Sequence, residues 1–318
     1  MKVLLLGSNG QLGHELAKQL PQVPQVLALD RSQCDLANDE FKDRLNLYVK
    51  EFNPDVLINA AAYTAVDKAE QEQTLAYQVN ATAPSVMAQI ASEYNIAFIH
   101  YSTDYVFDGE GDQPWSEDSP TNPQSVYGQT KCAGEELIRQ NAAEHIILRT
   151  SWVVGAHGNN FLKTMLRLAS ERDTLRVVSD QVGAPTSVDL LSKITMQLLK
   201  LCTQKDTKQK DTKQKDTKQK DTNPNIWGTY HVAPSGYTNW HAYATHVIQL
   251  ASKLGMSLKC TPENIVAISS SEYPLPAKRP LNSRLNTVKL VRLLGTPLPL
   301  WQTGVDDIIH SLVHRSKT

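Results

Sequence analysis

Residues 2–20 read KVLLLGSNGQLGHELAKQL, and this stretch decides the fold. It predicts a buried strand over residues 2–6, a glycine-rich turn, and a helix that begins directly after the turn. Gly7, Gly10 and Gly13 form a GxxGxxG pattern in that turn. Glycines let the backbone turn sharply and approach a pyrophosphate, while the helix N-terminus offers free N–H groups. The stretch is therefore typical of a strand–turn–helix unit that binds a dinucleotide.

Strand-like and helix-like segments alternate from this unit to about residue 153. Apolar strand patterns occupy residues 26–29, 55–62, 97–103 and 145–153, and helical patterns occupy residues 39–52, 74–94 and 128–142. The strand patterns are almost continuously apolar, which is typical of strands buried on both faces. The sequence therefore predicts an α/β fold, a doubly wound (Rossmann-type) parallel sheet covered by helices.

The pattern changes after Val153. A helical segment (160–172), a strand-like segment (175–180), a second helical segment (187–201) and a proline-rich segment (272–282) follow. We expect residues 1–150, joined by residues 186–232, to form the dinucleotide-binding domain. Residues 151–185 and 233–318 would form a smaller C-terminal substrate-binding domain. It would lie over the carboxyl ends of the strands, where ligands of open α/β sheets bind.

Residues 203–222 consist of TQKDT followed by three copies of KQKDT. The period of five matches neither a helix nor a strand, and the stretch contains no apolar residue. Because it cannot bury enough surface to offset the entropy of ordering it, we expect a disordered insertion.

Composition bounds the possible partners and the location. The 318-residue chain has 41% apolar residues and a net charge of −1, which gives no global field to attract nucleic acid or an anionic membrane. We therefore expect neither partner. The first apolar run ends at Leu6, too early for a signal peptide or a membrane span. The four cysteines form no CxxC pair, which favours reduced cysteines in a cytoplasmic protein.

Asp30 and Arg31 follow the second predicted strand and bear on the choice of cofactor. A carboxylate about 20 residues after the glycine turn binds the adenosine ribose hydroxyls and repels a 2′-phosphate. The guanidinium of Arg31 would attract that same phosphate. The two signals conflict, so NADPH and NADH both stay open.

Tyr127 and Lys131 lie four residues apart in YGQTK, which places both on one face of a helix. We expect the Lys131 ammonium to favour the phenolate and so to lower the pKa of Tyr127. Such a tyrosine can donate a proton to a carbonyl oxygen while hydride reaches the carbon. Thr103, in the STD sequence that ends a predicted strand, can hydrogen-bond the same oxygen. The three residues together predict a site that reduces a carbonyl group.

The GxxGxxG, STD and YxxxK motifs together resemble the extended short-chain dehydrogenase/reductases. More narrowly, six blocks resemble the dTDP-4-dehydrorhamnose reductase family: STDYVFDG, VYGQTKCAGE, RTSWVVG, NFLKTMLRLA, DQVGAPT and RPLNSRLNT. The resemblance implies NADPH- or NADH-dependent reduction of the 4-keto group of dTDP-4-dehydro-L-rhamnose to dTDP-L-rhamnose, with Tyr127 as the proton donor. It implies a dTDP-linked sugar as the substrate and allows a homodimer.

The motifs and the resemblance together assign roles to individual residues. The catalytic residues would be Thr103, Tyr127 and Lys131. The residues that bind the dinucleotide would be Gly7, Gly10, Gln11, Leu12, Gly13, Asp30, Arg31, Asp35, Leu36, Ala62, Tyr63, Thr64, Tyr127 and Lys131. The residues that contact the sugar nucleotide would be Thr103, Asp104, Trp152 and Arg279, with Arg279 as the cationic partner of the diphosphate.

Acidic residues bind magnesium in some relatives. Glu15 and Asp189 occupy plausible positions, but two scattered carboxylates do not predict a site for a cation that needs several oxygen ligands. We therefore assign no metal-binding residues, and magnesium stays open only as an additional cofactor. Two other functions stay open. One is another nucleotide-sugar ketoreductase or epimerase, and the other is a non-catalytic regulatory subunit that binds a dinucleotide.

Overall fold

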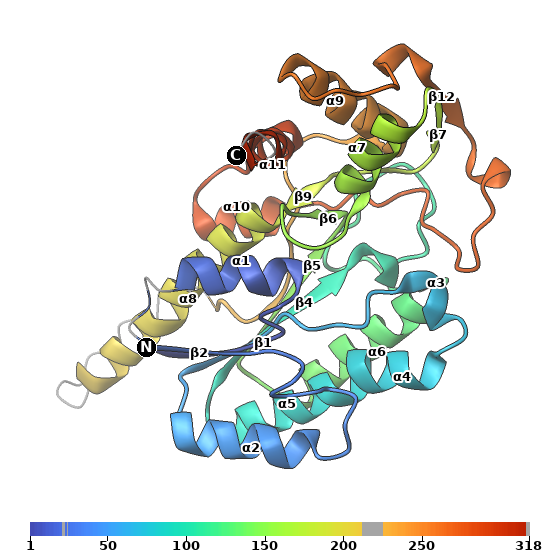
Figure 1. Cartoon of the computed structure of the whole chain (residues 1–318). Coiled ribbons are helices and arrows are strands. Elements are labelled where there is room, and N and C mark those ends of the chain that lie inside the picture. Colours follow the sequence, from blue (N-terminus) through green and yellow to red (C-terminus); the bar gives the residue numbers. More distant parts are fainter. Residues whose placement is uncertain (21–22, 24, 212–224, 316–318) are drawn as a thin grey trace.

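A six-stranded parallel sheet forms the centre of the protein in a computed structural model, which describes residues 1–20, 23, 25–211 and 225–315 (Figure 1). The strands lie in the order β2-β1-β3-β4-β5-β10. Their bounds are β1 Lys2–Leu6, β2 Gln25–Leu29, β3 Val56–Asn59, β4 Ala97–Thr103, β5 His145–Thr150 and β10 Gly228–His231. The prediction of a Rossmann-type fold is confirmed.

Helices cover both faces of this sheet (Figure 1). One face carries α1 (Gln11–Gln19), α8 (Val188–Asp211) and α10 (Val288–Leu294), and the other carries α2 (Phe41–Phe52), α5 (Ala83–Glu93) and α6 (Val126–Asn141). Successive side chains of a strand point to opposite faces. In β1, Val3 and Leu5 therefore pack with α1 and α8, while Leu4 and Leu6 pack with α2 and α5.

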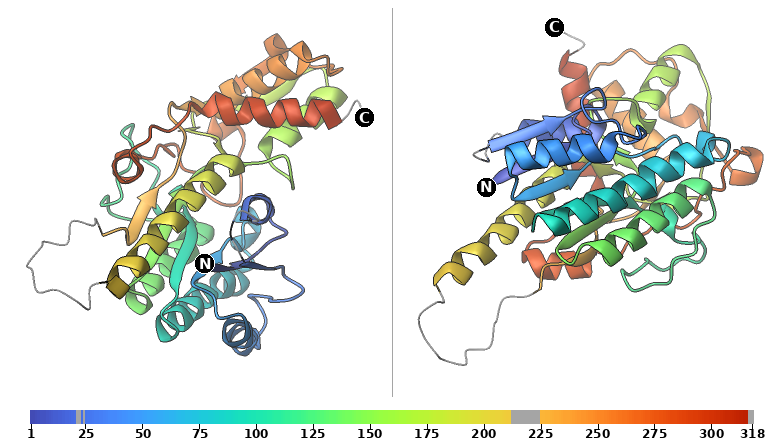
Figure 2. Two further views of the ribbon diagram at one scale, coloured as in Figure 1. Left: turned by 90° about the vertical axis from the view of Figure 1, so that its left-hand side faces the viewer. Right: turned by 90° about the horizontal axis from the view of Figure 1, so that it is seen from below.

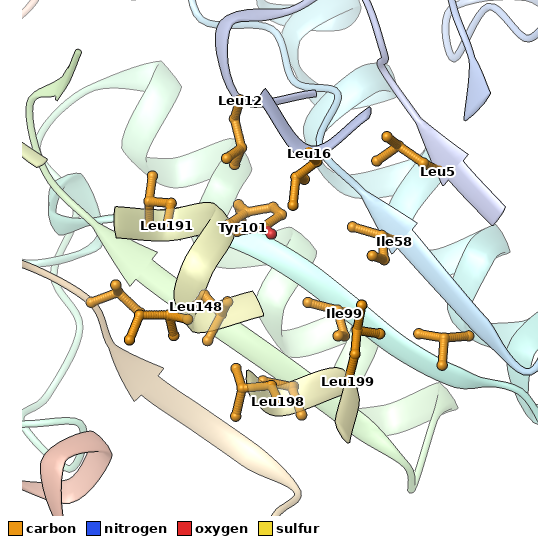
Figure 3. Packing of buried hydrophobic residues seen from close by; sticks show 14 of the residues in the cluster. Leu5, Leu12, Leu16, Ile58, Ile99, Tyr101, Leu148, Leu191, Leu198 and Leu199 are labelled. Atoms are coloured by element: carbon orange, nitrogen blue, oxygen red, sulfur yellow. The ribbon is translucent and has the colours of Figure 1, made fainter. Parts of the chain in front are cut away.

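The α1–α8 side of the core is filled by leucine and isoleucine side chains (Figure 3). Leu12 and Leu16 of α1 meet Leu191 of α8 over the sheet residues Ile58 and Ile99. Their packing fixes the first turn of α1 against the end of β1. The glycine turn between these two elements therefore has one defined position.

A smaller unit of helices and short strands lies beyond the carboxyl ends of β4 and β5 (Figure 1). Its main elements are α7 (Phe161–Glu171), β7 (Leu175–Val178), α9 (Trp240–Lys253), β12 (Ile265–Ile268) and α11 (Trp301–Arg315). The parallel pair β7–β12 and the helices α7, α9 and α11 pack around a second apolar core.

The remaining elements are short. The strand pairs are β6 (Val153–Val154) with β9 (Thr186–Ser187) and β8 (Val182–Gly183) with β11 (Thr238–Asn239). The short helices are α3 (Val66–Ala69), α4 (Gln73–Tyr77), the π-helix η2 (Gln78–Thr82) and the 3₁₀ helices η3 (Asp104–Val106), η4 (Pro262–Asn264) and η5 (Ser270–Glu272). Within the described ranges, every helix is too short or too polar to cross a bilayer.

The structure differs from our expectation for the repeat. Helix α8 continues through Asp211, so its last turns include residues 203–211, and its end extends past the sheet (Figure 2). Lysine and glutamine are good helix formers, and adding residues to an existing helix avoids the cost of a new nucleus. The rest of the predicted insertion, residues 212–222, lies outside the described residues.

The division into two domains stays a prediction, but the packing bears on it. β10 adds to the sheet beside β5, and α8 covers one face. Leu290 of α10 and Leu298 belong to the same core as α8. The segment around α10 therefore packs on the sheet, although we expected residues 233–318 in the substrate-binding domain.

Candidate active site

A cleft of about 920 Å³ lies where the sheet meets the smaller unit. Its floor is at the carboxyl ends of β1 and β3, where the strand order changes direction and where open α/β sheets bind their ligands. The predicted site residues that line the cleft are Gly7, Gly10, Gln11, Leu12, Arg31, Asp35, Leu36, Ala62, Tyr63, Thr64, Thr103, Asp104, Tyr127, Lys131 and Trp152. Three other predicted residues, Gly13, Asp30 and Arg279, do not line it.

Two of the three glycines of the turn, Gly7 and Gly13, have no room for a side chain. Gly7 has a φ of +83°, and a Cβ atom there would lie 2.7 Å from the backbone nitrogen of Ala61. A Cβ atom on Gly13 would lie 2.0 Å from the carbonyl oxygen of Gly7. Two backbone segments and the start of α1 thus approach each other closely at this turn. Gly13 therefore shapes the turn without lining the cleft.

Residues 155–160 fold over the glycine turn from the smaller unit. Asn160 Nδ2 donates to Gln11 Oε1 at 2.9 Å, and His157 Nε2 lies 3.2 Å from the carbonyl oxygen of Asn9. The imidazoles of His14 and His157 stack with their centroids 4.1 Å apart. This loop, which our sequence analysis missed, forms a second wall beside the residues expected to bind the pyrophosphate.

The Asp30 carboxylate binds its own turn. It accepts hydrogen bonds from the backbone and hydroxyl of Ser32 and, at 2.9 Å, from Asn9 Nδ2. The Ser32 hydroxyl is the largest of the influences that lower the pKa of Asp30. Arg31 is mostly exposed, lines the cleft and forms a 3.1 Å ion pair with Asp35. The Arg31 guanidinium thus lines the cleft, whereas the Asp30 carboxylate beside it is hydrogen-bonded to Ser32 and Asn9.

Tyr127 lies in the first turn of α6, behind the N-cap Ser125, and next to the end of β4. Burial raises the pKa of Tyr127 to about 12, an effect that the Thr103 hydroxyl opposes and the Asp104 carboxylate reinforces. Our expectation that Lys131 lowers this pKa is wrong for this arrangement, because Lys131 is directed elsewhere. Tyr127 is therefore a phenol, able to donate a proton, over the whole neutral range.

Lys131 is buried one turn further along α6. Its Nζ atom donates to the carbonyl oxygen of Tyr101 at 2.6 Å and lies 3.1 Å from Nε2 of His100. Burial lowers the pKa of Lys131 to about 8, against the raising effect of the Glu135 carboxylate. His100 is absent from our predicted site, although it stands two residues before Ser102 in the same strand.

Asp104 is 2% exposed at the start of η3, and its Oδ1 atom accepts a hydrogen bond from Thr103 at 3.1 Å. Burial raises the pKa of Asp104 to about 6, although the hydroxyls of Ser283 and Thr103 lower it. With a pKa of about 6, Asp104 is mostly ionised at neutral pH. Its carboxylate, beside Tyr127 and Thr103, can accept hydrogen bonds from hydroxyl groups of a ligand.

The raised pKa of Asp104 predicts a pH-dependent stability. Because the folded pKa of about 6 exceeds the ordinary value of 3.8, the folded state binds more protons and loses stability as the pH rises from about 4 to 6. At about 1.4 kcal/mol per pKa unit, Asp104→Asn should recover up to about 3 kcal/mol at pH 7. Urea unfolding of both proteins between pH 4 and 7, with Asp39→Asn as the exposed control, measures this. Parallel curves for Asp104→Asn and wild type would contradict it.

Of the residues predicted to contact the sugar nucleotide, Trp152 lines the cleft and Arg279 does not. Trp152 has a φ of +48° and stacks on Trp240, with ring centroids 3.7 Å apart, and both rings line the cleft. Arg279 Nη2 forms a 2.7 Å ion pair with Asp67, which also accepts the backbone N–H of Ala277. Arg279 is therefore held by a carboxylate in this structure.

The π-helix η2 positions the backbone of Tyr63 in the wall of the cleft. Asn80 Oδ1 accepts the backbone N–H of Tyr63 at 2.9 Å, and its Nδ2 atom donates to the Tyr63 carbonyl and to Thr130. Asn80 is 1% exposed, so these bonds are shielded from water. π-helical turns are frequent at functional sites. The sequence carries no signal for this turn because its pattern is that of a continuous helix.

The two carboxylates considered for magnesium contact each other only through an amide. Gln19 Nε2 donates to Glu15 at 3.1 Å and to Asp189 at 3.2 Å, and Lys193 pairs with Asp189 at 2.7 Å. Over the described ranges, no three histidine, cysteine, aspartate or glutamate side chains gather as metal ligands.

Known proteins resemble this chain over almost its whole length. A family model described as the RmlD substrate binding domain matches residues 1–314. The dTDP-4-dehydrorhamnose reductases of Salmonella typhimurium and Escherichia coli K12 are 44% and 42% identical to the chain, covering 97% and 98% of each sequence.

Two solved structures are similar over 98% of this chain and 99% of theirs. The crystal structure of a dTDP-4-dehydrorhamnose reductase from Clostridium acetobutylicum has a TM-score of 0.84 at 33% identity. That of a dTDP-4-dehydrorhamnose reductase from Bacillus anthracis, in complex with NADP, has a TM-score of 0.83 at 31% identity. The chain belongs to the RmlD family of dTDP-4-dehydrorhamnose reductases.

Proposed function

We propose that this protein reduces the 4-keto group of dTDP-4-dehydro-L-rhamnose to dTDP-L-rhamnose, with Tyr127 as the proton donor. The observation that carries the proposal is a half-buried tyrosine, held as a phenol beside Thr103, in a cleft behind a glycine turn. A reduction needs a protonated donor, because the carbonyl oxygen gains a proton when its carbon gains hydride.

The residues of the cleft fit a nicotinamide dinucleotide. The backbone at Gly10, Gln11 and Leu12 would meet the pyrophosphate at the N-terminus of α1, the end of the helix that favours an anion. Asp35 and Leu36 would contact the adenine. Ala62, Tyr63 and Thr64 would line the nicotinamide half, and Lys131 the ribose beside it. When bound, the dinucleotide supplies the hydride.

NADPH is the cofactor that we propose. The mostly exposed Arg31 guanidinium lines the cleft and pairs with Asp35 through Nε, so it would bind a 2′-phosphate by sharing or exchanging that contact, whereas Asp30 is bound to Ser32 and Asn9. The relative from Bacillus anthracis holds NADP, which supports the same choice.

The other residues would bind the sugar nucleotide. Thr103 would orient the carbonyl oxygen toward Tyr127, Asp104 would accept hydroxyl groups of the sugar, and Trp152 would pack on the substrate. Arg279 would bind the diphosphate, which requires that it exchange the Asp67 carboxylate for phosphate oxygens. Homodimer formation and a cytoplasmic location stay predictions.

Turnover tests the proposal directly. Purified protein should oxidise NADPH, and NADH more slowly, when dTDP-4-dehydro-L-rhamnose is added, and mass spectrometry should detect dTDP-L-rhamnose. Arg31→Ala should reduce the preference for NADPH. Tight NADPH binding without turnover would reject this substrate and favour another sugar nucleotide or a regulatory role.

A further inference from the structure

A buried chain of hydrogen bonds connects the sheet to Lys131. The backbone N–H of Ala61 donates to Asn59 Oδ1 at 3.0 Å, and Asn59 Nδ2 lies 3.1 Å from His100 Nδ1. His100 Nε2 lies 3.1 Å from Lys131 Nζ, which also donates to the Tyr101 carbonyl at 2.6 Å. Asn59, His100 and Lys131 are each 1–2% exposed. The chain is therefore shielded from water along its length.

The backbone at Ala61 fixes the direction of this chain. A backbone N–H can only donate, so the Asn59 oxygen faces Ala61 and the Asn59 NH₂ group faces the histidine. That NH₂ group can only donate, so His100 Nδ1 must accept. A neutral imidazole carries one proton, which therefore lies on Nε2 and points at Lys131.

We propose that Asn59 and His100 are positioning residues that set the protonation state of Lys131 by presenting it with an N–H group instead of a lone pair. A neutral amine can accept that hydrogen bond, whereas an ammonium has three donors and no acceptor. The ammonium form therefore faces a donor at close range. The His100 N–H group therefore opposes protonation of Lys131. The orientation of that N–H group is fixed, through Asn59, by the backbone N–H of Ala61.

The charges around the pair support this arrangement. Burial lowers the pKa of His100 well below 6.5 and the Lys131 charge lowers it further, so the imidazole stays neutral. Glu135 is the carboxylate that favours the ammonium of Lys131. Its oxygens, however, accept hydrogen bonds from Arg149 at 2.9 and 2.6 Å and from Arg139 at 2.6 Å. The neighbouring carboxylate is thus shared with two guanidinium groups.

The consequence for the reaction rests on the proposed function. The Lys131 pKa of about 8 lets the side chain gain or lose a proton close to neutral pH. A lysine whose pKa lies close to neutral favours the phenolate of Tyr127 less than a lysine that stays an ammonium at every accessible pH, so more of the proton donor stays protonated before the reaction. His100 thereby acts through Lys131 without lining the cleft itself.

The tautomer can be observed without any activity. Nitrogen NMR of the whole protein labelled with ¹⁵N-histidine should show, at pH 7, a His100 ring protonated on Nε2 and unprotonated on Nδ1. The His100 signals are those missing in His100→Gln. Asn59→Asp should move the proton to Nδ1, because both carboxylate oxygens accept. A wild-type His100 protonated on Nδ1, or on both nitrogens, overturns the proposal even if no variant folds.

The effect on Lys131 is measured by titration. In ¹³Cε-lysine NMR, with Lys131→Met identifying the signal, His100→Gln should raise the Lys131 pKa by about one unit or more, because its amide oxygen can accept from the ammonium. In the active enzyme, the pH profile of kcat/KM of His100→Gln should shift to higher pH. His145→Gln, at a histidine bonded to the Ala142 carbonyl, is the matched control. An unchanged Lys131 pKa in a folded His100→Gln protein contradicts the inference, whichever substrate is turned over.

Discussion

Replacing Tyr127 with phenylalanine is expected to lower kcat by about 100-fold to 10,000-fold, the contribution of a positioned acid to proton transfer. The substitution removes one hydroxyl from a half-buried ring, so the cleft keeps its shape. Burial raises the pKa of this phenol to about 12, so it is protonated at neutral pH. The variant keeps the ring that would contact the dinucleotide, so its loss of NADPH affinity should be small beside its loss of the chemical step, measured as kcat with dTDP-4-dehydro-L-rhamnose under saturating NADPH.

Tyr243→Phe is the matched control for this loss. Tyr243 also lines the cleft and is buried, and its hydroxyl has no hydrogen-bond partner among the described residues. Removing that hydroxyl should leave kcat within a small factor of wild type. Equal losses in the two variants would indicate a packing effect, and an active Tyr127→Phe enzyme would exclude Tyr127 as the donor.

Glu135→Gln should destabilise the protein by about 3–5 kcal/mol, the cost of leaving a buried charge without its partner. Glu135 is fully buried and receives two hydrogen bonds from Arg149, which is 2% exposed. Burial raises the pKa of Glu135, but the hydrogen bond and the charge of the Arg149 guanidinium lower it. The net shift of the Glu135 pKa is downward. A neutral amide leaves the Arg149 charge in the core, uncompensated.

Urea unfolding measures this loss, with Glu171→Gln as the control. Glu171 pairs with Arg167 on the surface of α7, where both side chains are half exposed or more. Exposed pairs contribute about 0–1 kcal/mol, so this control should unfold almost as wild type does. Similar midpoints for the two variants would show that the Glu135–Arg149 pair is not stabilising.

The sequence predicted most of the fold because its signals are local. Residues 2–6 form β1 as expected, and the helical patterns at 39–52, 128–142 and 160–172 correspond to α2, α6 and α7 within two residues at each end. Glycine spacing identified the turn, and the YxxxK spacing placed Tyr127 and Lys131 on one helix. Each of these features depends on residues close together in the chain.

The site was less predictable because its partners come from distant elements. Lys131 was expected to act on Tyr127, but its Nζ atom contacts His100 and the Tyr101 carbonyl, both in β4. His100 in turn is hydrogen-bonded to Asn59 in β3. Arg279 is bound to Asp67, far away in sequence. The pKa of Asp104 depends on its burial and on the hydroxyl of Ser283, which is far away in sequence. A motif gives residue types at a spacing, whereas these contacts require the tertiary structure.

The position of β10 at one edge of the sheet has a consequence for synthesis. β5 is complete at Thr150, but the strand that pairs with it begins only at Gly228. While the intervening chain emerges from the ribosome, β5 presents an unpaired edge of N–H and C=O groups, which is a template for wrong pairing. The nascent chain is thus open to wrong pairing at β5 from the emergence of Thr150 until Gly228 follows, and a protein shortened before Gly228 would retain that unpaired edge permanently.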